Sequence, residues 1–336
     1  MAEQKIRWGV LGYARIARET VIPAIRRAAN SEFHALASRD EAKLAQCRER
    51  HGVPKSYSSY DELLRDAAIN AVYIPLPNSL HREWTIKAAE QGKHVLCEKP
   101  LGLNAAECRE MVAVCQANGV LLMEAFMYRY NARTRLVREV LRSGALGEIR
   151  HVTSSFRFLL ANPASIKLRP ELGGGGLYDV GCYPVNFIGM VADESARGPV
   201  TPGSVKPETV SVQCERSGGV DMNLSALLKY GSGLIGAVHC GLNAHRRVYS
   251  EIIGTLGVLE VPDTFFDNAG LLTLTTGETR REIAVEESDR YRLEVEDFAD
   301  AILQRRAPQF PLSESLRNAE VMDRLFAASR AGAPNG

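Results

Sequence analysis

The segment Lys5-Ile-Arg-Trp-Gly-Val-Leu-Gly12-Tyr-Ala-Arg-Ile-Ala17 decides the fold prediction for this chain. It begins as a mainly apolar strand that ends at Gly12, and the residues that follow, up to Asn30, have the periodicity of a helix. A strand, a glycine turn and a helix in this order open a dinucleotide-binding unit. The pyrophosphate would lie on the turn and on the helix N-terminus. We therefore expect this turn to bind a cofactor through Gly12, Tyr13, Ala14, Arg15 and Ile16, with alanine in place of the second glycine of G-x-G-x-x-G/A. The alternative is a tight turn that binds no ligand.

The residues after the second expected strand, 33–37, bear on the choice of cofactor. Ser38, Arg39 and Asp40 come first, and Lys43 follows one helical turn later. An acidic residue at this distance from the glycine turn holds the ribose of NAD, whereas an arginine suits the 2′-phosphate of NADP. The order favours NADP(H), bound by Ser38, Arg39 and Lys43. NAD(H) stays possible if Asp40 faces the ribose, and the two basic residues also fit a solvated helix start.

Two further strand ends complete the expected cofactor site. Residues 71–75 form the third strand, and its proline-rich loop supplies Pro75, Leu76, Asn78 and His81, of which the last two also fit a helix start. The segment His94-Val-Leu-Cys-Glu-Lys-Pro100 is a buried strand that ends on charges. Ligands of parallel sheets bind beyond the carboxyl ends of the strands, so we expect Glu98 and Lys99 to face the cofactor. The alternative is a solvated Glu-Lys pair.

The order of strands and helices predicts two domains. Up to Glu124 strands alternate with helices, which indicates a doubly wound parallel sheet. After Glu124 a helix up to about Ser143 is followed by β-rich segments with short polar turns, which are typical of an antiparallel sheet. These segments are 148–158, 209–214, 223–229, 233–240, 251–261 and 271–275, and helices near 292–304 and 314–331 close the chain. We therefore expect an α/β protein with domains 1–125 and 126–336.

A glycine run in the second half leads into another candidate site. Gly173–Gly176 precede an apolar, partly helical segment that carries Asp179, Tyr183 and Asn186. On a helix these three residues share one face. Because the segment is otherwise apolar, a polar stripe there is more typical of a site than of a solvated surface. The alternative is that Tyr183 is a packed helix residue whose hydroxyl group bonds to the backbone.

Composition and charge exclude several classes of partner. The chain has 336 residues, 45% of them hydrophobic and 24% charged, and a formal net charge of +1. Without a clustered basic run it offers no argument for nucleic acid or for a membrane surface, which leaves a small molecule. We find no signal peptide, no apolar run of the ~20 residues that cross a bilayer and no metal-ligand spacing. Seven scattered cysteines without a C-x-x-C pair predict reduced thiols in a cytoplasmic protein.

Together these motifs resemble the glucose-fructose oxidoreductase, inositol dehydrogenase and rhizopine-catabolism oxidoreductase family over nearly the whole chain. The matching segments are GVLGYARIA, VYIPLPNSLH, HVLCEKPLG, MEAFMYRY, GGGGLYDVGCYPVN and LRNAEVMDRL, and Glu98-Lys99-Pro100 is the most specific of them. The resemblance implies a Rossmann domain, then an α/β domain with an open, mostly antiparallel sheet that forms a homodimer or homotetramer. It also implies that Lys99 is catalytic and that the Lys99–Pro100 peptide is cis.

Tyr183 stands where one branch of this family has histidine. The chain is therefore similar to the branch of dimeric dihydrodiol dehydrogenases, NADP-linked xylose dehydrogenases and ketosugar reductases. This implies NADP(H)-dependent hydride transfer to or from a sugar-like CH–OH or C=O group. The alternatives are a trans-dihydrodiol dehydrogenase or dicarbonyl reductase, and a cofactor-binding regulator without turnover, against which the presence of Lys99, Asp179 and Tyr183 together speaks.

The resemblance also suggests roles for the catalytic residues. Tyrosine, with a pKa of about 10, becomes a useful proton donor and acceptor when an ammonium group ~4–6 Å away lowers that pKa. We assign this role to Tyr183, the ammonium to Lys99, and positioning of the substrate or lysine to Asp179. Lys99 is the acid/base in the alternative assignment. Candidate substrate residues are Tyr128, Arg129, Phe156, Arg157, Lys167, Arg169 and Asn186.

Overall fold

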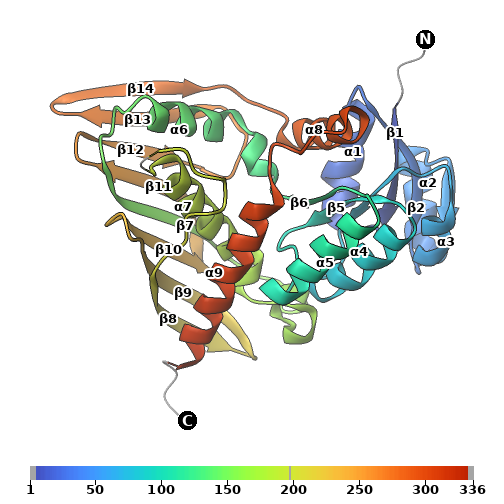
Figure 1. Cartoon of the computed structure of the whole chain (residues 1–336). Coiled ribbons are helices and arrows are strands. Elements are labelled where there is room, and N and C mark those ends of the chain that lie inside the picture. Colours follow the sequence, from blue (N-terminus) through green and yellow to red (C-terminus); the bar gives the residue numbers. More distant parts are fainter. Residues whose placement is uncertain (1–4, 197, 332–336) are drawn as a thin grey trace. The chain divides into compact units, whose positions relative to one another are not determined.

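The computed structural model describes residues 5–196 and 198–331, which form two compact units (Figure 1). One unit combines the chain up to Tyr130 with Asp289–Leu312. The other combines Asn131–Ser288 with the chain from Ser313 onward. Residues 126–130 and 289–312, which the sequence-based division gives to the second domain, thus belong to the first unit.

The first unit is built on a parallel sheet of six strands in the order β3-β2-β1-β4-β5-β6. Sequential strands pair in parallel register on both sides of β1, which is the order of a doubly wound sheet. This confirms the Rossmann prediction. The short edge strand β3 was not expected. The strands are β1 (Ile6–Leu11), β2 (Ser31–Ala37), β3 (Lys55–Tyr57), β4 (Ala71–Ile74), β5 (His94–Glu98) and β6 (Leu122–Ala125).

Helices between the strands make the crossovers of this sheet. The first begins with the π-helical turn η1 (Ala17–Val21) and continues as α1 (Ile22–Arg27). The others are α2 (Glu41–His51), α3 (Tyr60–Arg65), η2 (Asn78–Leu80), α4 (His81–Glu90), α5 (Ala105–Ala117) and η3 (Met127–Tyr130). Crossovers of this kind place the loops that follow β1, β2, β4 and β5 at one edge of the sheet.

The late helix α8 (Arg290–Gln304) also belongs to the first unit. Its Phe298 ring lies 5.8 Å from the ring of Trp8 on β1. Asn30 donates a hydrogen bond to the backbone carbonyl of Glu296 at 2.9 Å, and the Tyr130 hydroxyl group donates to Asp297 at 2.8 Å. These apolar and polar contacts explain why residues 289–312 pack in the first unit, although they come late in the sequence.

The second unit contains an eight-stranded sheet in the order β14-β13-β12-β11-β7-β10-β9-β8. Every neighbouring pair is antiparallel except β7 with β10, which confirms the mostly antiparallel sheet. The strands are β7 (Ile149–Leu159), β8 (Thr209–Ser217), β9 (Val220–Lys229), β10 (Ile235–Gly241), β11 (Asn243–Gly254), β12 (Gly257–Pro262), β13 (Gly270–Thr276) and β14 (Thr279–Val285). The expected segment 251–261 is wrong as a single strand, because Thr255 and Leu256 form a turn within it.

Helix α7 covers one face of this sheet. On β7, Phe156 lies on the α7 side, where its ring is 5.4 Å from that of Tyr183. Side chains alternate along a strand, so Arg157 lies on the opposite face. The remaining helical elements of the unit are α6 (Ala132–Arg142), η4 (Ile166–Leu168), η5 (Pro170–Leu172), η6 (Leu177–Gly181), α7 (Cys182–Glu194) and α9 (Leu312–Ala331).

Candidate functional site

The turn after β1 has the geometry that a phosphate-binding turn needs. Gly12 has a φ of +96°, and its N–H donates to the carbonyl of Ala37 at 2.8 Å. A Cβ atom at Gly12 would lie 3.0 Å from a Leu76 methyl group, so the turn packs closely against the loop after β4. The helix begins directly after this turn, since Arg18 N–H donates to the carbonyl of Ala14 at 3.0 Å. Backbone amides at residues 14–16 therefore stand at a helix N-terminus.

Tyr13 differs from the other residues of the turn in where its side chain lies. The ring is buried, and it packs edge-on against His51 of α2 with centroids 6.0 Å apart. Burial raises the pKa of the Tyr13 hydroxyl to about 12, and the neighbouring Cys47 contributes to the rise. Tyr13 therefore contributes its backbone to the turn, whereas Arg15 is exposed and Ile16 is half-buried.

After β2, the side chains of Asp40 and Arg39 lie in different places. One carboxylate oxygen of Asp40 accepts hydrogen bonds from Ala42 N–H at 3.0 Å and Lys43 N–H at 3.4 Å, which caps α2. The buried Ser38 hydroxyl accepts from Asp40 N–H at 3.2 Å and holds this cap in place. The exposed guanidinium group of Arg39 lines a neighbouring cavity, and Asp40 does not belong to that lining.

This cavity has a volume of about 440 Å³, within the range of small-molecule sites. It is lined by Arg39, Ser58, Ser59, Tyr60, Asp61, Leu80, Glu83 and Trp84. The two acidic residues are paired with Lys87, whose Nζ lies 2.7 Å from Glu83 and 3.9 Å from Asp61. Arg39, 6.0 Å from the Tyr60 ring centroid, is the basic residue among the described residues of the lining. Residues 58–60 and Trp84 carry no sequence motif, so sequence reasoning missed them.

His81 links two loops at this edge of the sheet. It is fully buried, with Nε2 2.9 Å from the Leu76 carbonyl and Nδ1 2.8 Å from the Pro100 carbonyl. Burial lowers the pKa of this imidazole. Its side chain therefore supports the loops after β4 and β5 rather than facing a cavity. Pro75 in the first loop is buried, and Leu76 and Asn78 are half-buried.

The backbone around Lys99 is held on both sides by carboxylates. Glu98 accepts a hydrogen bond from the Tyr73 hydroxyl at 2.5 Å and another from Lys99 N–H at 3.3 Å. Burial raises the pKa of Glu98, and the Lys99 ammonium opposes the rise. After the cis Lys99–Pro100 peptide, which the resemblance implied, the buried Glu124 accepts from Leu101 N–H at 2.8 Å. The alternative of a solvated Glu-Lys pair is therefore wrong for Glu98.

In the second unit, Asp179 and Tyr183 each have a defined partner. The Asp179 carboxylate lies 2.7 Å from Nζ of Lys167, which is also 5.0 Å from the Phe158 ring centroid. The buried Tyr183 ring packs against Phe156, and against Phe265 at 5.3 Å. Asp179 lies in the π-helical turn η6, so the α-helical spacing used to align it with Tyr183 and the fully buried Asn186 applies only from Cys182 onward.

The glycine run is a packed turn that positions η6. Gly175 has a φ of +121°, and a Cβ atom there would lie 2.2 Å from a carboxylate oxygen of Asp221. The other oxygen of Asp221 accepts from Leu177 N–H at 2.6 Å, at the start of η6. Burial raises the pKa of Asp221 to about 6. Asp221 lies on β9, far along the sequence, and no motif could have pointed to it.

The remaining substrate candidates are dispersed. Arg157 lies on the face of the sheet opposite Phe156, so these sequence neighbours do not share a site. Arg169 pairs with the exposed Glu171 at 2.5 Å. In the first unit, Tyr128 is fully buried beside Phe126, and the guanidinium group of Arg129 lies 5.1 Å from the Phe310 ring centroid.

Residues 5–196 and 198–331 contain neither a candidate metal site nor a membrane-spanning helix. Within these residues no group of three or more His, Cys, Asp or Glu side chains is arranged to hold a metal ion. No helix in the same ranges is long and apolar enough to span a bilayer.

Comparison with known protein families gives matches over both units. The model of the GFO/IDH/MocA oxidoreductase family, described as having an NAD-binding Rossmann fold, matches residues 6–126. The model of the GFO/IDH/MocA C-terminal domain matches residues 134–260.

Relatives and a solved structure resemble the chain over most of its length. D-xylose 1-dehydrogenase (NADP(+)) 2 of Haloferax volcanii is 37% identical, over 97% of this chain and 98% of its own. Trans-1,2-dihydrobenzene-1,2-diol dehydrogenase of Sus scrofa is 34% identical, over 77% of this chain and 74% of its own. The crystal structure of KijD10, a 3-ketoreductase from Actinomadura kijaniata in complex with NADP and TDP-benzene, has a TM-score of 0.88 and 29% identity, over 97% of this chain and 98% of its own.

Proposed function

Because the chain belongs to the GFO/IDH/MocA oxidoreductase family, we propose that it transfers a hydride between NADP(H) and a sugar-like CH–OH or C=O group. It would act as an aldose dehydrogenase or as a ketosugar reductase. The preference for NADP(H) over NAD(H) rests on the different placement of two residues after β2: Asp40 caps α2, whereas Arg39 lines the 440 Å³ cavity. The similarity to an NADP(+)-linked xylose dehydrogenase and to an NADP-bound 3-ketoreductase supports the same cofactor and substrate class.

The loops at the carboxyl edge of the sheet fit this cofactor. The close-packed Gly12 turn and the amides of residues 13–16 would receive the pyrophosphate. Arg39, which lines the cavity, would hold the 2′-phosphate as the main charge. Ser38 and Lys43, which lie outside this lining, would assist it from the same loop and helix start. Pro75, Leu76 and Asn78 would line the path toward Glu98 and Lys99, and His81 would support that path from within. The nicotinamide, when bound, supplies the hydride chemistry.

The protein itself must handle a proton and orient the substrate. We assign proton donation and acceptance to Tyr183, with the Lys99 ammonium favouring its ionised form. The alternative assignment makes Lys99 the acid/base and leaves Tyr183 to orient the substrate. The 2.7 Å Asp179–Lys167 pair supports a third role, in which the two side chains together bind hydroxyl groups of the substrate.

Substitution of the two central residues tests this assignment. Lys99→Ala should lower kcat by about 10²- to 10⁴-fold, the usual contribution of general acid–base catalysis, while NADPH still binds. Tyr183→Phe should lower kcat to a similar degree, because it removes the hydroxyl group and little volume. Steady-state kinetics and NADPH fluorescence titration measure the two quantities. Near-normal turnover in Lys99→Ala would remove the assignment.

A dihydrodiol dehydrogenase or dicarbonyl reductase is the second candidate, and one observation favours it. The Phe156 ring lies 5.4 to 5.9 Å from those of Tyr183, Phe265 and Phe266, so aromatic groups gather beside the candidate tyrosine. Such a cluster suits an aromatic substrate. The porcine relative carries that activity in its name.

One substrate panel separates the candidates. NADP⁺ reduction and NADPH consumption would be followed with aldoses, ketosugars, trans-dihydrodiols and dicarbonyls. We expect the highest kcat/KM with an aldose or ketosugar. A maximum with dihydrodiols or dicarbonyls would replace the sugar assignment, and NADPH binding without turnover on any class would indicate a regulator.

Two further properties complete the proposal. We propose a homodimer or homotetramer formed through the open face of the eight-stranded sheet, since Leu227, Ile235 and Leu271 on that face are exposed. We also propose a cytoplasmic location, which the scattered cysteines without a C-x-x-C pair support.

A further inference from the structure

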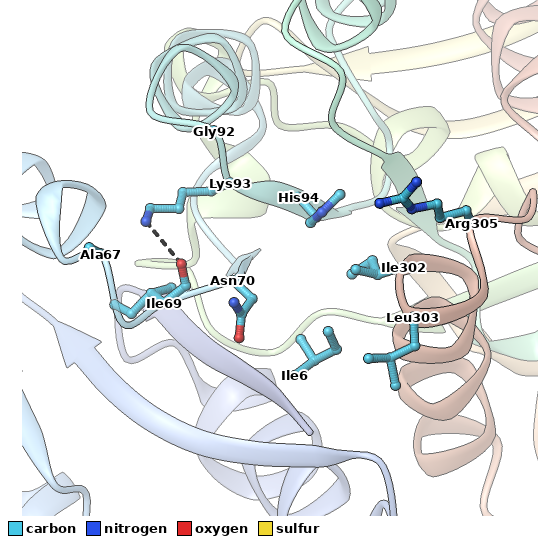
Figure 2. Close-up of a pocket in the computed structure, with 10 residues that line it drawn as sticks. All are labelled: Ile6, Ala67, Ile69, Asn70, Gly92, Lys93, His94, Ile302, Leu303 and Arg305. Atoms are coloured by element: carbon cyan, nitrogen blue, oxygen red, sulfur yellow. Dashed lines mark hydrogen bonds between the residues drawn. The ribbon is translucent and has the colours of Figure 1, made fainter. Parts of the chain in front are cut away.

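A second cavity lies at the opposite edge of the Rossmann sheet (Figure 2). Ile6 and His94 are the first residues of β1 and β5, and Asn70 directly precedes β4. The carboxyl ends of these same strands carry the proposed cofactor loops. The cavity has a volume of about 530 Å³ and lies wholly within the first unit. Its lining residues are Ile6, Ala67, Ile69, Asn70, Gly92, Lys93, His94, Ile302, Leu303 and Arg305.

Hydrogen-bond donors dominate the polar part of this lining. His94 Nδ1 accepts from Leu121 N–H at 2.9 Å, so its proton is on Nε2, which is left to donate. The side-chain oxygen of Asn70 accepts from Arg7 N–H at 2.9 Å, which leaves its amide NH₂ group as a donor. Lys93 uses two donors on the carbonyls of Asp66 and Ile69, at 2.8 and 2.9 Å, and retains a third. None of the described residues in the lining is acidic.

Arg305 adds an unusual backbone conformation to this set. It ends α8 with a φ of +53°, a left-handed conformation in which glycine or asparagine is more usual. An arginine there costs about 1 kcal/mol or more relative to glycine. Figure 2 shows the guanidinium group of Arg305 directed toward His94. The strained position thus brings a planar double donor to the cavity.

The apolar part of the lining is offered by Ile302 and Leu303, which are half-buried, whereas Ile6 and Ile69 are almost fully buried. We propose that this cavity binds a small organic carboxylate with an apolar body. Arg305, His94 and Asn70 hold the carboxylate, and the half-buried side chains of Ile302 and Leu303 contact the body. Inorganic phosphate matches the donors but leaves the aliphatic walls unused. The proposal does not depend on the proposed hydride transfer, because it concerns the other end of the strands.

Calorimetric titration of the full chain with benzoate, at constant ionic strength, tests the site. We expect a dissociation constant of about 1 mM, as is typical for a ligand of this size. Benzyl alcohol, which lacks the charge, and inorganic phosphate, which lacks the apolar body, should each bind at least tenfold more weakly. Benzyl alcohol or phosphate binding as tightly as benzoate would overturn the assignment.

Three variants locate the binding. Arg305→Asn keeps a residue that tolerates the left-handed conformation but removes the guanidinium group, and it should weaken benzoate binding at least tenfold. Ala67→Phe should fill the cavity and abolish binding. Arg65→Gln changes another exposed arginine of the same unit, outside the lining, and should leave binding unchanged. Unchanged affinity in both Arg305→Asn and Ala67→Phe would overturn the proposal. NADPH affinity, measured in parallel, should be retained in all three variants and shows that they are folded.

Discussion

Arg39 and Asp40 are adjacent residues with opposite charges, and their side chains lie in different places: Asp40 caps α2, whereas Arg39 lines the 440 Å³ cavity. From the sequence either could face a cofactor ribose. The hydrogen bonds of Asp40 to Ala42 and Lys43 settle that its carboxylate serves the helix. A one-dimensional pattern could not separate them, because both interpretations use residues at the same distance from the glycine turn. The choice depends on which side chain the local backbone turns toward α2.

Arg39→Ala should weaken NADP(H) binding about 10- to 100-fold, because a charge-assisted bond to phosphate is worth about 1.5–3 kcal/mol. NAD(H) binding should change less than about twofold. Lys43→Ala is the matched control, since its Nζ is exposed and lies 4.0 Å from Asp40, and it should have a smaller effect. Fluorescence titrations with NADPH and NADH measure both variants. An equal loss for the two cofactors would contradict the 2′-phosphate role.

Lys167→Gln should raise the KM for the sugar substrate about tenfold, because Asp179 loses an ion-pair partner at 2.7 Å that helps to orient its carboxylate. The affinity for NADPH should be unaffected. Arg135→Gln provides the control, since it removes an ion pair, with Glu139, that is exposed on both sides. If the two variants have the same KM, the Asp179–Lys167 pair has no part in substrate binding.

At the scale of elements, buried regular segments could be predicted and polar ones could not. Strands β1, β4 and β5 are apolar and are buried on both faces, so the sequence shows them clearly. Strand β14 was missed because its first residues, Thr279 to Glu282, are polar and exposed. The π-helical turn η6 was missed as well, since its shape depends on the packing of Gly175 against Asp221 rather than on its own residues.

Gly175→Ala should destabilise the protein by about 2 kcal/mol or more, because the added methyl group meets the Asp221 carboxylate in a backbone conformation that already disfavours alanine. Gly277→Ala is the matched control, because Gly277 also has a positive φ, of +56°, but no atom lies within 4 Å of the new Cβ. It should cost only about 1 kcal/mol. Denaturant unfolding of both variants gives the difference, and similar free energies of unfolding would show that the contact is not tight.

Asp221 should also make stability depend on pH. Its folded pKa of about 6 lies above the ordinary value of 3.8, so its contribution is complete below pH 4 and is lost as the pH rises through 6. Two pKa units correspond to about 3 kcal/mol. Asp221→Asn cannot ionise, and should therefore gain about this much relative to the wild type between pH 4 and pH 7. Unfolding free energies at both pH values test this, and a constant difference would contradict it.

At the scale of the whole molecule, the sequence predicts two domains that follow one another along the chain, whereas each unit of the fold combines two separate segments. The family resemblance correctly implied the two kinds of sheet. However, α8 packs on β1 through Phe298 and Trp8, which are almost the full chain length apart. Nothing local to either segment encodes that contact. The cavity at Arg305 forms because α8 packs against the start of the parallel sheet. Its lining therefore combines distant parts of the sequence, and it could not be predicted as a site.

The open face of the eight-stranded sheet is large enough to hold two copies of the chain together. Eight strands spaced ~4.8 Å apart give a face about 38 Å wide, and the length of a seven-residue strand such as β10, β13 or β14 gives it a height of about 24 Å. The resulting area, about 900 Å² per copy, is that of a stable interface. Leu227 on β9 and Ile235 on β10 lie close together on this face, because Ile235 pairs with Lys229, two residues after Leu227. Their exposed fractions are 52% and 38%.

The double variant Leu227→Glu, Ile235→Glu should therefore dissociate the oligomer into monomers, because like charges would face each other across an apolar contact. Leu256→Glu introduces the same charge at a residue that is 63% exposed in the turn between β11 and β12, and should leave the oligomer intact. Light scattering coupled to size-exclusion chromatography gives the masses. A wild-type mass equal to that of one chain, or an oligomer that survives the double substitution, would place any assembly of this protein elsewhere than on the sheet.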